Sequence, residues 1–450
     1  MLPQMLAGYL FLLIFRPYEY WPILGDFRIE RVYMLIFMAM VFFSRDKQYT
    51  PSPINGAVVL FSLLLLVSSA FSFSWDASWG LTQDYLKYVI FYLMAILSIR
   101  NEKDFRFIVV AFIGVMFLYV GKSAWEFFLH DRYVWRMGIR RMVGIDATYG
   151  DPNSFAASIC YSLPLAWAMI RSKFDNVWMR RFFWAYGFLA LVAIMFTGSR
   201  SGMVTFLLFL FLLVMGTSRK MLGIVLAGLL LIFSWDYMPE DLQMRFLSTF
   251  SSEYSTTEGG ASSAEGRAAG FRQGLKLFAD NPVLGVGPAN FPLNWPGLVR
   301  GPNAHNLYGQ LLGELGFLGF CIFGTMIWLV YRNNANVMSR WKLWQKTHNQ
   351  ENGVISASGK SMRTEDKTSE TKNGVGGQKR NGILDGLLSI SSPLALHPYV
   401  AQAIIQTMLL MFFKGWADHN LYRYTWLWLA ALTVLNQHYF NLQWARHGQR

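Results

Sequence analysis

Arg200 lies where a charged side chain is costly. It stands in Thr197-Gly-Ser-Arg-Ser-Gly202, between two apolar stretches. A charge near membrane hydrocarbon costs roughly 2.5–3.5 kcal/mol, so it needs a partner or a role. Glycine and serine allow N–H groups to converge on an anion at a helix start, and a guanidinium beside them matches phosphate oxygens. The segment therefore indicates an anion site, the alternative being an arginine that extends to the membrane surface.

Further arginines fall in two other segments. One group lies in the loop 129–152 and is either a second anion-binding surface or a set of solvated side chains: Arg132, Arg136, Arg140 and Arg141. The other group is Arg267 and Arg272, near the start of a helix expected over 264–279. The five-residue spacing of this pair does not require that both side chains face the same way.

His305 precedes a long apolar stretch that contains one acidic residue, Glu314. Imidazole can act as a base near neutral pH, although a histidine at a helix start is often a cap. Asp418, His419 and Arg423 occupy the corresponding end of a later apolar stretch. They are candidates for a shell that supports His305.

The chain has no metal-ligand spacing and no cofactor motif, and its two cysteines lie in apolar runs. Arginines together with a histidine therefore favour a phosphate-bearing lipid substrate, with guanidinium groups neutralising a pyrophosphate leaving group. Aromatic side chains in the same loops could stack on sugars or form an interfacial belt. They are Trp75, Trp79, Trp135 and Trp295.

The elements that position these residues are membrane-spanning helices. The chain has 450 residues, of which 54% are hydrophobic and only 15% charged. Soluble proteins carry about 25% charged residues, so a soluble enzyme, a disulfide scaffold and a disordered chain are excluded. The net charge of +13 would suggest nucleic acid in a soluble protein. Here most basic residues collect in loops on one side of the expected membrane, so we expect membrane lipids and no nucleic acid as partners.

The expected fold class is all-α, a polytopic integral membrane protein in a single membrane domain over 1–450. We predict about twelve transmembrane helices, each from a stretch of roughly 20 apolar residues or somewhat fewer. The stretches are 5–24 (broken at Arg16 and Pro17), 29–44, 54–73, 85–99, 107–128, 153–170, 182–199, 202–217, 221–237, 304–331, 396–415 and 421–440.

Orientation follows from the basic residues of the short loops. Those after spans 2, 4, 6 and 8 and at the chain end are rich in Lys and Arg, which places both termini in the cytoplasm. The loops 129–152 and 238–303 are then periplasmic, and the second is expected to be partly helical. Residues 332–392 are polar and basic, which predicts a flexible cytoplasmic insertion.

Several motifs together resemble the O-antigen ligase / O-antigen polymerase superfamily. They are the 197–202 segment, Gly-Arg at 266–267, Asn-Pro-Val-Leu-Gly-Val-Gly-Pro-Ala-Asn-Phe at 281–291, Ala-His-Asn-Leu-Tyr at 304–308 and Glu-Leu-Gly-Phe-Leu-Gly at 314–319. Gly150-Asp-Pro-Asn-Ser-Phe-Ala156 is similar to another segment of the family. The resemblance covers roughly 130–330. Two features depart from the family: Phe271 stands where a tryptophan is common, and the 332–392 insertion is long.

The resemblance implies a metal-independent membrane enzyme of the bacterial inner membrane. It would transfer a glycan from an undecaprenyl-pyrophosphate-linked donor to an acceptor hydroxyl at the periplasmic face, with inversion. His305 would be the base, and Arg200 and Arg267 would bind the pyrophosphate. Asp151 and Asn153 match a family segment without an assigned role, and we count them with Arg140 and Arg141 as substrate-binding candidates.

The sequence does not identify the molecule that accepts the glycan. It could be a lipid A core sugar, a surface polymer or a protein side chain, and a polymerase would join two lipid-linked units instead. A transporter of a phosphate-bearing lipid predicts internal repeats and mid-span charges. No repeat is visible, and the mid-span charges are few (Lys87, Lys122 and Glu314). A structural subunit predicts that His305 is dispensable.

Overall fold

A computed structural model describes residues 1–45, 47–136, 138–145, 150–217, 220–236, 238–247, 259–358 and 393–447. It is 78% helix and 2% strand. The predicted helical fold class is therefore confirmed, except for one two-stranded hairpin that the sequence did not reveal.

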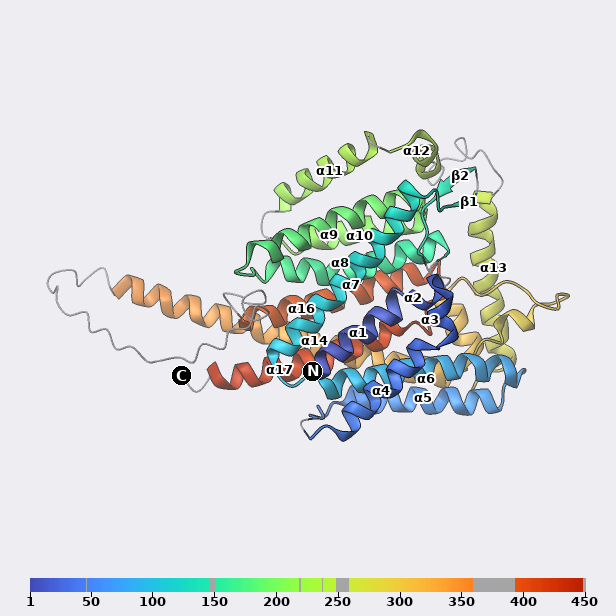
Figure 1. The fold of residues 1–450 in the computed structure, drawn as a ribbon, viewed down its shortest axis with the longest axis horizontal. Helices are drawn as coiled ribbons and strands as arrows, with labels where there is room; N and C mark the ends of the chain where they lie inside the picture. Colours follow the sequence, from blue (N-terminus) through green and yellow to red (C-terminus); the bar gives the residue numbers. More distant parts are fainter. Residues whose placement is uncertain are drawn as a thin grey trace.

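The described part of the chain is a series of helices, and the β1–β2 hairpin lies between α7 and α8 (Figure 1). The elements are α1 (Leu2–Ile14), α2 (Pro17–Tyr20), α3 (Pro22–Asp26), α4 (Ile29–Phe43), α5 (Pro53–Ala70), α6 (Trp75–Ser98), α7 (Glu102–Leu129), β1 (Val134–Arg136), β2 (Ile139–Arg141), α8 (Pro152–Arg171), α9 (Val177–Phe196), α10 (Arg200–Met215), α11 (Lys220–Asp236), α12 (Glu240–Leu247), α13 (Gly259–Asp280), the short 3-10 helix η2 (Phe291–Asn294), α14 (Leu307–Ser358), α16 (Pro393–Gly415) and α17 (Tyr424–His447).

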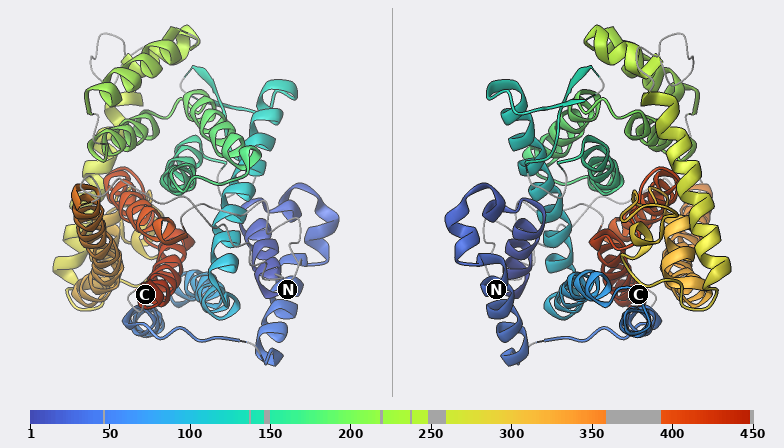
Figure 2. Two further views of the ribbon diagram at one scale, coloured as in Figure 1. Left: turned by 90° about the vertical axis from the view of Figure 1, so that its left-hand side faces the viewer. Right: turned by 90° about the vertical axis from the view of Figure 1, so that its right-hand side faces the viewer.

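Most of these helices run roughly along one direction, and α13 crosses the end of the bundle where the β1–β2 hairpin lies (Figure 1). We call this the hairpin end. Figure 2 shows the bundle nearly end-on, with α13 lying over one side of it. Helix α14 packs against α13, α16 and α5, and α16 packs against α8. Met1 and the end of α17 lie away from the hairpin end (Figure 1). The cytoplasmic location of both termini stays a prediction.

Five helices among the described residues are long and apolar enough to cross a membrane. They are Pro53–Ala70, Glu102–Leu129, Val177–Phe196, Leu307–Thr347 and Leu394–Gly415. Two shorter apolar helices are Arg200–Met215 and Lys220–Leu229. Each of the twelve expected spans falls on at least one helix, but the number that cross the membrane, and the side on which each loop lies, stay predictions.

Helix α14 continues well beyond its expected end at residue 331. It extends into the expected insertion because apolar side chains recur at helical spacing, and Val337 and Trp341 pack with Leu394 and Phe440. The structure thus differs from the expectation over 332–358, where the chain is helical. Residues 359–392, the remainder of the expected flexible insertion, lie outside the described residues.

Helix α14 is interrupted at Gly316, whose φ of 62° and ψ of −158° are not helical. The turn-rich segment before η2 supplies the hydrogen bonds that the helix loses there. The N–H of Val286 donates to the carbonyl of Gly313 (2.9 Å), and the N–H of Phe317 donates to the carbonyl of Pro282 (2.8 Å). A spanning helix can break where other protein groups satisfy its backbone. The short first part of α14, before Gly316, is thereby anchored to the segment that precedes η2.

Candidate functional site

The turn between α9 and α10 presents Arg200 as the first residue of α10. Ser199 is the N-cap, and its hydroxyl accepts a hydrogen bond from the N–H of Gly202 (3.1 Å). Thr197 and Ser199 are fully buried, whereas Arg200 is half-buried. The predicted turn with a helix start is confirmed, and a helix start favours anions nearby.

Arg141 lies beneath this turn, with only 1% of its surface exposed. Its Nε donates to the carbonyl of Thr197 (2.7 Å) and its Nη2 to Oδ1 of Asn153 (3.2 Å). The same Oδ1 accepts from the hydroxyl of Ser199 (2.8 Å). Arg141 and Asn153 therefore brace the turn that carries Arg200, and their contact with substrate stays a prediction.

The two other candidates from this region lie nearer the surface. Asp151 caps α8, accepting from the N–H groups of Asn153 (3.1 Å) and Ser154 (3.0 Å). Arg140 is on the exposed hairpin, where it pairs with Asp131 (3.1 Å) and its guanidinium lies over the ring of Tyr133 (4.6 Å). Asp151 thus fixes the start of α8, and Arg140 occupies the hairpin surface.

Glycines bring Arg267 to the start of α14. Helix α13 packs there so closely that a Cβ on Gly270 would lie 2.1 Å from the carbonyl oxygen of Ala304. One turn further, a Cβ on Gly274 would lie 2.4 Å from the carbonyl oxygen of Gly309. Small residues four apart allow helix backbones to touch. Arg267 lies one turn before this contact.

His305 lies two residues before the start of α14 and has a left-handed backbone with φ of 44°. For residues other than glycine this conformation costs about 1–3 kcal/mol and is concentrated at functional sites. Its neighbours hold it: Ala304 is 2% exposed, and Asn306 caps the helix by accepting from the N–H of Gly309 (2.9 Å). The imidazole is exposed, with its ring centroid 5.2 Å from that of His419.

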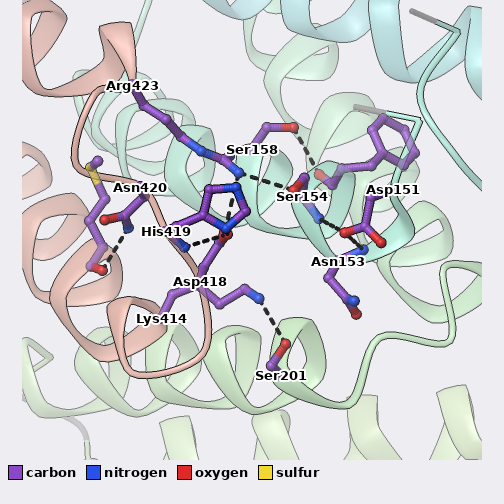
Figure 3. Close-up of polar contacts among 12 residues, drawn as sticks. Asp151, Asn153, Ser154, Ser158, Ser201, Lys414, Asp418, His419, Asn420 and Arg423 are labelled. Carbon is purple, nitrogen blue, oxygen red and sulfur yellow. Dashed lines mark hydrogen bonds and ion pairs between the residues drawn. The ribbon is translucent and has the colours of Figure 1, made fainter. Parts of the chain in front are cut away.

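The loop after α16 carries Asp418, His419 and Arg423, the residues expected to support His305 (Figure 3). Asp418 is 5% exposed and pairs with Arg423 (3.2 Å). It also accepts from the N–H of His419 (2.9 Å), and Arg423 donates to the hydroxyl of Ser154 (3.0 Å). These contacts join the 418–423 loop to α8 and place the His419 ring against His305.

Lys414 was missed by the sequence reasoning. It is 1% exposed, near the end of α16, and its Nζ donates to the hydroxyl of Ser201 (2.8 Å) at the start of α10 (Figure 3). A lysine at the end of an expected span that faces away from the cytoplasm runs against the positive-inside bias. The same departure from the positive-inside bias pointed to the arginines of the 129–152 loop, and it could have pointed to Lys414 as well.

Glu314, a mid-span charge in the sequence, lies two residues before the break at Gly316 in α14, with 1% of its surface exposed. Its carboxylate accepts from the hydroxyl of Tyr422 (2.8 Å), from Nε2 of Gln310 (3.3 Å) and from the N–H of Phe291 (3.3 Å). It ties the broken helix to the 418–423 loop and to the segment before η2.

The charges at the hairpin end act on one another. Partial desolvation lowers the pKa of His305 below 6.5. The negative charge of Asp418 raises this pKa, and the positive charge of Arg267 lowers it further. Burial, followed by the charge of Arg200, lowers the pKa of Arg267. Burial would raise the pKa of Asp418, but neighbouring cations, Arg423 first, outweigh it and hold the pKa at about 2. Near pH 7 this leaves a neutral imidazole that senses two carboxylates, Asp418 and Asp151, and the guanidinium groups of Arg267 and Arg136.

A neutral histidine beside guanidinium groups can accept a proton while the cations hold a phosphate-bearing group. Among the described residues no group of three or more His, Cys, Asp and Glu side chains could hold a metal ion. The apolar helices fit a multi-pass membrane protein, and this polar cluster lies at one end of them.

The family model for O-antigen ligase matches residues 185–324. This match confirms the predicted resemblance to the O-antigen ligase/polymerase superfamily. The matched segment contains Arg200, Arg267 and His305, whereas Lys414 and Asp418 lie beyond it. No curated protein matches the chain at a significant level.

Proposed function

We propose that this protein transfers a glycan from an undecaprenyl-pyrophosphate carrier to an acceptor hydroxyl at the periplasmic face of the bacterial inner membrane. The observation that carries the proposal is the place of Arg267 between two other residues of the matched segment, Arg200 and His305. Close packing of α13 on Ala304 brings Arg267 to the start of α14, where it acts electrostatically on His305, and Arg200 at the start of α10 acts in turn on Arg267.

In the proposed step, a ring nitrogen of His305 takes the proton of the acceptor hydroxyl. The acceptor oxygen forms a bond to the anomeric carbon while the bond from that carbon to the pyrophosphate oxygen breaks. The pyrophosphate leaves with the bonding electron pair, and attack from the opposite face inverts the anomeric centre. General-base catalysis of this kind contributes about 10²- to 10⁴-fold.

Arg200 and Arg267 bind the pyrophosphate and stabilise the charge that develops as it departs. Each guanidinium offers a planar fork for two phosphate oxygens. Lys414 adds a third cation behind Ser201 at the start of α10. In this proposal the cations perform the neutralisation that a divalent metal performs in other sugar transferases.

Purified protein in detergent tests the proposal, with an undecaprenyl-pyrophosphate glycan, a panel of acceptors and a chelator, and with products read by mass spectrometry. We expect transfer by the wild type and a loss of about 10²-fold or more in His305→Ala. His130→Ala, an exposed histidine after α7, is the matched control and should transfer normally. Normal transfer by His305→Ala would contradict the base assignment.

The acceptor panel separates the alternatives. Product on a lipid A core, a surface polymer or a protein would indicate a ligase, and longer carrier-linked chains would indicate a polymerase. Carrier binding without any product would favour a transporter. A requirement for added divalent metal would contradict the role given to the arginines.

A further inference from the structure

The imidazole of His305 packs against a second histidine ring. Within the part of the chain that the structure describes, it makes no side-chain hydrogen bond, and its one ring contact is with His419. The two ring centroids lie 5.2 Å apart, and the ring planes meet at 71°. A catalytic base is usually oriented by a third group, because the last torsion of a histidine side chain is otherwise broad. His419 occupies the place of such a group.

The ring of His419 is itself held by Asp418 (Figure 3). Its Nδ1 is buried, makes no hydrogen bond to any described residue and lies 3.9 Å from Oδ1 of Asp418. The same oxygen accepts the N–H of His419 (2.9 Å), and the other carboxylate oxygen pairs with Arg423 (3.2 Å). A ring nitrogen that carries a proton is attracted to a carboxylate at this distance, so Asp418 favours one direction of the ring.

Two hydrogen bonds tie the end of α16 and the 418–423 loop to α14. Nδ2 of Asn306, the neighbour of His305, donates to the carbonyl of Trp416 (3.4 Å). The hydroxyl of Tyr422 donates to the carboxylate of Glu314 (2.8 Å). The contact between the two histidine rings is therefore fixed by the packing of the fold, although the imidazole of His305 is exposed.

We propose that His419 is a positioning residue for His305. The inference rests on the proposed function. The ring of His419 holds the imidazole of His305 in the direction from which its nitrogen meets the acceptor hydroxyl, and Asp418 holds the ring of His419. His419 does not take the proton itself. Both supporting residues lie beyond the segment that the family model matches, so this part of the site comes from the C-terminal part of the chain.

Two substitutions separate the ring of His419 from its nitrogens. His419→Phe keeps a flat ring that can pack edge to face but has no nitrogen, whereas His419→Ala removes the ring. His130→Ala is the matched control, because His130 is also a histidine beside an aromatic ring, with its centroid 5.9 Å from that of Trp125.

The first test measures kcat and KM of purified protein with an undecaprenyl-pyrophosphate glycan and the acceptor that the wild type uses. We expect His419→Ala to lower kcat about tenfold and to leave the KM of the donor unchanged, since an aromatic pair contributes up to about this much. His130→Ala should change neither value. A normal kcat in His419→Ala, or a rise in KM in its place, would overturn the proposal.

His419→Phe distinguishes positioning from proton transfer. Its kcat should stay within about threefold of the wild type, because the ring contact is kept. The acid limb of its pH–rate profile should also remain, because His305 still supplies the base. A loss as large as that of His419→Ala would overturn the proposal, because His419 would then act through its nitrogens.

A second measurement needs no turnover. Protein labelled with ¹³C at Cε1 of histidine gives an NMR signal for each ring, and His305→Ala identifies the signal of His305. We expect the neighbouring ring to displace this signal in the wild type and in His419→Phe, and the signal to move to the position of a free imidazole in His419→Ala. An unmoved signal in His419→Ala would overturn the pairing of the rings. Absence of wild-type transfer to any acceptor would instead overturn the proposed function.

Discussion

Gly270→Ala tests whether the contact between α13 and α14 positions the proposed site. The added Cβ would lie 2.1 Å from the carbonyl oxygen of Ala304, and real Cβ contacts are essentially never below 3.0 Å. The two backbones must therefore separate by about 1 Å, which is the scale of misplacement that costs about 10²-fold in rate. Arg267 lies one turn away on α13, so it should move relative to His305.

The expected result is a fall in transfer of about 10²-fold, corresponding to about 2.7 kcal/mol. The assay is the purified transfer reaction, with rates normalised to monodisperse protein from gel filtration. Gly266→Ala is the control, because it lies one turn earlier on the same helix and its added Cβ meets no atom within 4 Å. Alanine also favours helix by about 1 kcal/mol over glycine, so this variant should fold and transfer normally.

Two outcomes would decide whether the packing of α13 on α14 positions Arg267. Transfer by Gly270→Ala within twofold of Gly266→Ala would refute the claim that close glycine packing sets the distance from Arg267 to His305. A selective loss in Gly270→Ala, with unchanged gel-filtration behaviour, would support it.

Two further predictions concern the charges of the site. Arg200→Lys should lower kcat/KM about tenfold, because an ammonium lacks the planar two-pronged fork of a guanidinium. Kinetics of the purified variant would measure this, and an unchanged kcat/KM would contradict the role given to Arg200. For pH, transfer should fall as the medium is acidified through the pKa of His305, which lies below 6.5. Asp418→Asn removes a charge that raises this pKa, so the acid limb of the pH–rate profile should move to lower pH, and a shift to higher pH would contradict the assignment.

The sequence predicted the helical elements well because apolar stretches and caps are local features. The break at Arg16 and Pro17, the turn before Arg200 and the helix expected over 264–279 all appear close to their expected places. The β1–β2 hairpin was missed, since each strand has only three residues. The length of α14 was also missed, because partners from α16 and α17 stabilise its polar extension.

By itself, the sequence determined the class of the protein and the kinds of residue at its site. A charge deficit spread over long apolar runs requires a membrane protein, and arginines with a histidine favour a phosphate-bearing substrate. The tertiary structure alone decided which of these residues meet. Arg141 is buried as a brace and Arg140 lies on the surface, although they are neighbours in the sequence. Lys414 joins the site from more than a hundred residues beyond His305. Such contacts depend on how distant helices pack, which local periodicity does not encode.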